Sequence, residues 1–94
     1  MESIDSLIEQ LKSEIKSLQP GVKGTSRHLK INEILGKIAF RKDMRGSSRI
    51  VSSLKEKIEI RSSSKKLNDF GGESRIMILI NHDIGRLQDL QYEN

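Results

Sequence analysis

Hydrophobic residues recur at helical spacing over the first twenty residues of the chain. They follow one another at intervals of four, three, four and three positions, which places them on one stripe of a helix. Ser3 is a suitable N-cap and Pro20-Gly21 stops the segment, so we expect a helix within residues 1–19. The stripe fits either a core face or the seam of a dimer. Its residues are Ile4, Ile8, Leu11, Ile15 and Leu18.

The middle of the chain shows a strand pattern followed by two helical patterns. Residues 27–31 alternate between polar and apolar side chains, which predicts a short strand. Asn32 can then cap a helix that ends near Phe40. Ser47 or Ser48 can cap the next helix. The apolar face of that helix consists of Ile50, Val51, Leu54 and Ile58.

The last third of the chain allows two interpretations. In the first, Ile58 and Ile60 belong to one strand, residues 62–74 form a loop, the apolar run 75–80 is a second strand, and residues 83–91 form a closing helix. In the second, the segment from Ile76 to Leu90 is a single helix. That interpretation depends on residues that share one helical face, namely Ile76, Ile80, Ile84 and Leu87.

The first interpretation gives an element order that resembles a winged helix-turn-helix domain. We therefore expect a single α+β domain over residues 1–94, with a helix-turn-helix-like basic region at 27–60 and a wing at 58–80. The resemblance implies that the helix from Ser48 to about Lys57 enters the major groove of DNA. The second interpretation gives the alternative, a small all-α helical bundle.

Charge is distributed unevenly along the chain, whose formal net charge is +4. Residues 21–66 hold thirteen basic and four acidic side chains, whereas both flanking segments are mildly acidic. Such asymmetry points to a polyanionic partner, because Lys and Arg contacts to phosphate supply most sequence-independent affinity for nucleic acid. The expected contacts are Lys23, Arg41, Lys42, Arg45, Arg49, Ser52, Lys55 and Lys57, with Arg61, Lys65 and Lys66 on the wing.

The sequence offers little support for catalysis or metal binding. It contains no cysteine, and His28 and His82 are far apart and have no second imidazole or thiol at ligand spacing. Asp69-Phe70-Gly71 matches a kinase motif, but the other kinase motifs are missing. We expect no enzyme activity, no cofactor and no metal site.

The three aromatic residues are dispersed, which favours duplex recognition over the base stacking used by single-strand binders. The sequence therefore predicts a small intracellular, homodimeric protein that binds duplex nucleic acid, DNA rather than RNA, and regulates transcription or replication. No segment resembles a secretory signal or a membrane span. Two alternatives remain open: a helical dimer that binds duplex RNA by shape, of the viral or host-defence antagonist type, and a helical protein-interaction adaptor.

Overall fold

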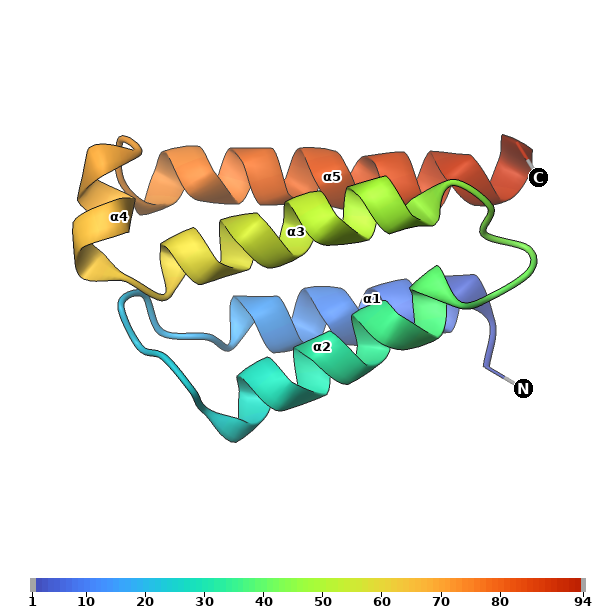
Figure 1. The fold of residues 1–94 in the computed structure, drawn as a ribbon, viewed down its shortest axis with the longest axis horizontal. Coiled ribbons are helices and arrows are strands. Elements are labelled where there is room, and N and C mark those ends of the chain that lie inside the picture. Colours follow the sequence, from blue (N-terminus) through green and yellow to red (C-terminus); the bar gives the residue numbers. More distant parts are fainter. Residues whose placement is uncertain (1, 94) are drawn as a thin grey trace.

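The computed structural model describes residues 2–93, and these form a bundle of four long helices with a short fifth helix in the last connection (Figure 1). No strand occurs between residues 2 and 93. The helices are α1 (Ile4–Lys16), α2 (Ser26–Ala39), α3 (Ser47–Arg61), α4 (Ser64–Asp69) and α5 (Glu73–Glu93).

The four long helices alternate in direction, so the bundle has up-down-up-down topology (Figure 1). α3 packs most extensively against α5, and α1 packs most extensively against α2. One end of the bundle carries α4 and the connection between α1 and α2; we call it the loop end. The first and last described residues lie at the opposite end.

Helix α1 confirms the helix expected in the N-terminal segment. The Ser3 side chain accepts a hydrogen bond from the backbone N–H of Ser6, at 3.0 Å, and so caps the first turn. All five residues of the predicted stripe are buried within the single chain, Leu18 being the most exposed at 6%. The stripe is therefore a core face, and its assignment as a dimer seam is wrong.

Helix α2 replaces the predicted strand at 27–31, and Asn32 is not its cap. The helix begins at Ser26, and the Thr25 side chain accepts from the backbone N–H of His28. The apolar residues that follow have helical spacing and share one buried face, so packing against α1 and α3 outweighs the short alternating pattern. That face consists of Ile31, Ile34, Leu35 and Ile38.

Helices α3 and α4 replace the first strand and the loop of the predicted wing. α3 continues through Ile58 and Ile60 to Arg61, because Ile58 extends the buried face already formed by Leu54. The alternation of Ile58 and Ile60 covers too few residues to compete with that packing. Residues 64–69 then form α4 within the segment expected to be a loop.

Helix α5 confirms the alternative interpretation of the last third. It replaces both the strand at 75–80 and the closing helix at 83–91 with one helix of 21 residues. The four residues that share its inner face are at most 2% exposed, and they are Ile76, Ile80, Ile84 and Leu87. The winged-helix prediction is therefore wrong, and the fold is the all-α bundle.

Candidate nucleic-acid interface

Arg61, expected at the tip of a wing, is buried and serves the structure of the bundle. Its guanidinium donates to the carbonyl oxygens of Ile15 at 3.3 Å and Leu18 at 3.1 Å, where α1 ends. It also forms an ion pair with Glu73 at 2.9 Å. Because these acceptors lie on α1 and α5, Arg61 ties three elements together and is not available to a phosphate.

Lys57 was expected on the outer face of α3 but turns toward α5. Its Nζ lies 2.7 Å from a carboxylate oxygen of Asp83, which is 1% exposed and also accepts from Ser53 at 2.6 Å and Arg86 at 3.3 Å. Burial raises the pKa of Asp83, but hydrogen bonds from Lys57 and Ser53 outweigh burial, and the pKa lies below its ordinary value. Lys57 is thus the counter-ion of a buried carboxylate.

Arg41 is also paired within the chain. Its Nε and one terminal nitrogen each donate to Asp43, both at 2.9 Å, and another terminal nitrogen contacts the carbonyl oxygen of Glu2. The hydrogen bonds from Arg41 hold the pKa of Asp43 below its usual range. A bidentate pair of this kind uses the donors that would otherwise bind a phosphate.

The remaining predicted contacts separate between the two ends of the bundle. Lys42, Arg45 and Arg49 are exposed, and they lie where α2 ends and α3 begins, away from the loop end (Figure 1). Ser52 is exposed on α3, but its face of that helix carries both signs of charge, since Glu56 and Glu59 follow. The outer face of α3 is therefore not uniformly basic.

Four lysines gather toward the loop end. The backbone N–H of Gly21 donates to the carbonyl oxygen of Arg61 at 2.9 Å, and a Cβ on Gly21 would lie 2.5 Å from Ser64 Oγ. The connection between α1 and α2 therefore lies directly against the start of α4. None of the four lysines pairs with a carboxylate among residues 2–93. We call them the loop-end lysine cluster: Lys23, Lys55, Lys65 and Lys66.

Two members of the cluster line one open groove of about 400 Å³. Lys23 contributes from the connection after α1, and Lys55 contributes from α3. Glu59 is the one carboxylate among the lining residues. The others are Gly24, His28, Asn32, Ile58 and Ser62. Two ammonium groups and an amide around one groove suit a phosphate-bearing ligand.

A chain of hydrogen bonds fixes the wall of this groove. Ser62 Oγ donates to the carbonyl oxygen of Ile58 at 2.8 Å, so His28 Nε2, at 2.6 Å, donates to Ser62. His28 Nδ1 then accepts from Thr25 Oγ1 at 2.7 Å. In this pattern the Ser62 hydroxyl proton points to a backbone carbonyl rather than to the imidazole. The hydrogen bond between His28 and Ser62 links α2 to the end of α3.

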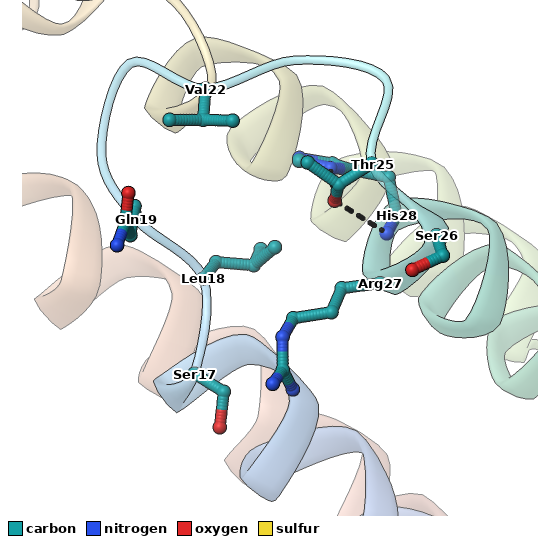
Figure 2. A pocket seen from close by; sticks show the side chains of 8 residues that line it. All are labelled: Ser17, Leu18, Gln19, Val22, Thr25, Ser26, Arg27 and His28. Atoms are coloured by element: carbon teal, nitrogen blue, oxygen red, sulfur yellow. Dashed lines mark hydrogen bonds between the residues drawn. The ribbon is translucent and has the colours of Figure 1, made fainter.

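A second cavity of about 270 Å³ adjoins the groove, with His28 common to both (Figure 2). Figure 2 shows the Arg27 side chain extending from α2 toward the end of α1, where its guanidinium lies 3.3 Å from Glu14. Leu18 and Val22 form the apolar part of the lining. Because Arg27 is paired, this cavity adds no unpaired cation to the cluster.

Sequence reasoning missed His28, Asn32 and Ser62 as parts of the groove. His28 and Ser62 are 34 positions apart, so no local pattern joins them. Gly21 and Gly24, which flank Lys23 in the connection between α1 and α2, both have positive φ. Lys23 itself was expected as a phosphate contact, and it lines the groove.

No protein-family model matches this chain, and neither the curated proteins nor the solved structures contain a match. None of the helices described is both long and apolar enough to cross a bilayer. Within residues 2–93, no three acidic or histidine side chains come together in a way that could hold a metal ion.

Proposed function

We propose that this protein is a non-catalytic binder of duplex nucleic acid, which it contacts through phosphates at the loop-end lysine cluster. The supporting observation is that four exposed lysines on three segments lack carboxylate partners among residues 2–93: Lys23 and Lys55 line one groove, and Lys65 and Lys66 lie on α4. The ammonium group of lysine is a flexible point charge that tolerates variation in phosphate position. Such a cluster favours binding to the backbone over reading of base edges.

Duplex is favoured over single-stranded nucleic acid because the cluster has no platform of exposed aromatic residues. Phe40 and Tyr92 are 91% and 81% exposed, but both lie at the end of the bundle opposite α4. Phe70, which follows α4, is the one aromatic side chain near the cluster. Stacking of successive bases requires several such rings.

The sequence-based prediction of DNA over RNA depends on a winged helix, which this fold lacks. Phosphate contacts serve DNA and RNA duplexes alike, so the proposal covers both. Competition between DNA and RNA duplexes of the same sequence decides between them. Preferential binding of RNA would favour recognition by the shape of the A-form helix.

Fluorescence anisotropy with a labelled duplex at several salt concentrations tests the proposal. Removing Lys23, Lys65 and Lys66 together by substitution with Gln lowers affinity at least about tenfold and flattens the slope of log K against log salt by about 3. The matched control removes the same charge at the other end, by Lys42→Gln, Arg45→Gln and Arg49→Gln. We expect this control to retain most of the affinity.

Equal losses in both triple variants would show that total charge, not the cluster, drives binding. A larger loss of affinity in the control variant would indicate that the interface lies at the start of α3. Absence of salt-dependent binding by the unaltered protein would overturn the proposal itself.

A further inference from the structure

The outward face of α5 carries two large exposed apolar residues separated by a glycine. Ile78 is 68% exposed and Tyr92 is 81% exposed. Gly85 lies midway between them, seven residues from each, so all three lie close to one line along the helix. His82 and Asp89 are exposed on the same face. We call this set the Gly85 stripe: Ile78, His82, Gly85, Asp89 and Tyr92.

Nothing in the described chain explains why position 85 is a glycine. A Cβ placed there meets no atom within 4 Å, and φ is not positive. Glycine destabilises the interior of a helix relative to alanine, because it loses more backbone conformational entropy on folding. The missing side chain does leave a notch on the surface, into which the backbone of another helix can approach closely.

The Gly85 stripe is complementary to itself when two copies run antiparallel. A two-fold axis at Gly85 places Ile78 of one copy opposite Tyr92 of the other, because each lies seven residues from the centre. The same axis brings His82 of one copy, three residues before the centre, beside Asp89 of the other copy, four residues after the centre. Each contact occurs twice, as an isologous interface requires.

We propose that a second copy of this chain docks on α5, with the two α5 helices antiparallel and crossing at Gly85. Two apolar anchors, two imidazole–carboxylate pairs and a central close approach then form one interface. The anchors are few and the area is small, so the dimer is weak and assembles at micromolar concentrations.

The outward face of α2 is the nearest rival surface. It also carries a central glycine, Gly36, between the exposed residues Leu29 and Phe40. Its charged groups, however, are already paired within the chain, since Lys37 lies 3.9 Å from Glu33 and 3.5 Å from Glu2. On α5, by contrast, neither His82 nor Asp89 forms an ion pair among residues 2–93, which favours α5.

Sedimentation of the Gly85→Gln variant over about 10–500 µM tests the proposal. A glutamine at the crossing point blocks close approach, so the dissociation constant rises at least about tenfold. The same change raises the thermal midpoint of the dilute monomer, because glutamine is a better helix former than glycine. A residue with only a structural role in the monomer would not give these opposite effects.

Gly36→Gln is the matched control, because a Cβ there also meets nothing within 4 Å. We expect it to raise the thermal midpoint and leave the dissociation constant unchanged. A strictly monomeric unaltered protein at the highest concentration would overturn the proposal. So would dissociation caused by Gly36→Gln and not by Gly85→Gln, since that result places the interface on α2.

Crosslinking gives a second readout that does not depend on affinity. The chain contains no cysteine, so Gly85→Cys introduces a single thiol at the two-fold axis. Mild oxidation of this variant gives a covalent dimer, whereas Gly36→Cys stays largely monomeric under the same conditions. Equal crosslinking of both variants would indicate random collision and would contradict the proposed crossing.

Discussion

Single residues decide which of the basic side chains are available to a ligand. Lys57 and Arg61 look like surface charges in the sequence, but the carboxylate that Lys57 contacts lies 26 positions away, and the two carbonyl oxygens that Arg61 contacts lie 43 and 46 positions away. Helical spacing gives the side of a helix on which a residue lies, and not which long-range carboxylate or carbonyl meets it. For this reason the sequence could predict the basic character of the region but not which lysines remain exposed.

Asp83→Asn tests the buried ion pair between α3 and α5. Removing the carboxylate leaves Lys57, with a 20% exposed side chain, without its counter-ion. We expect a loss of about 2–4 kcal/mol in the free energy of unfolding, measured by urea denaturation. Glu93→Gln, at an exposed position of the same helix, serves as the control and should change stability by less than about 0.5 kcal/mol. Similar effects of the two changes would contradict a structural role for Asp83.

The same carboxylate makes stability depend on pH. The pKa of Asp83 in the folded protein lies below its ordinary value of 3.8, so its contribution to stability is complete above that value. The contribution is lost as pH falls through the lower, folded-state pKa. Unfolding followed by circular dichroism between neutral pH and strong acid should show this loss in the unaltered protein and a smaller one in Asp83→Asn.

At the scale of elements, long apolar periodicities proved to be better guides than short ones. The stripe of α1 and the inner face of α5 each extend over several turns, and both gave helices that the structure contains. The strands at 27–31 and 58–60 came from alternations of only a few residues, which cannot be distinguished from part of a helical face. The short helix α4 escaped notice because its segment is rich in serine and glycine, and Leu67 is its one buried residue.

Thr25 provides the cap that the sequence interpretation assigned to Asn32. Thr25→Ala removes the acceptor for the first turn of α2 and the partner of His28 Nδ1. We expect it to cost about 1–2 kcal/mol of unfolding free energy, measured by thermal or urea denaturation. The control is Ser26→Ala, one position further on and exposed. Greater destabilisation by Ser26→Ala would place the helix start elsewhere.

At the scale of the whole molecule, folding divides a block of charge that is continuous in the sequence. The antiparallel bundle sends Lys42, Arg45 and Arg49 to one end and Lys23, Lys65 and Lys66 to the other (Figure 1). The linear pattern could show that residues 21–66 are basic. It could not show this separation, because the separation depends on the direction of each helix.

Circular dichroism provides the simplest check of the bundle as a whole. Because residues 2–93 contain five helices and no strand, the spectrum should be dominated by helix, with one cooperative loss of signal on heating. A substantial β contribution to the spectrum would support the predicted hairpin at 58–80 and contradict the helical bundle.

An even number of long antiparallel helices returns the chain to the side of the bundle where it started. A fluorophore, an affinity tag or a surface linker attached at either terminus therefore projects away from Lys65 and Lys66. Protein immobilised in this way holds α4 toward the solution, so surface-based and single-molecule measurements can be made with the lysines unobstructed.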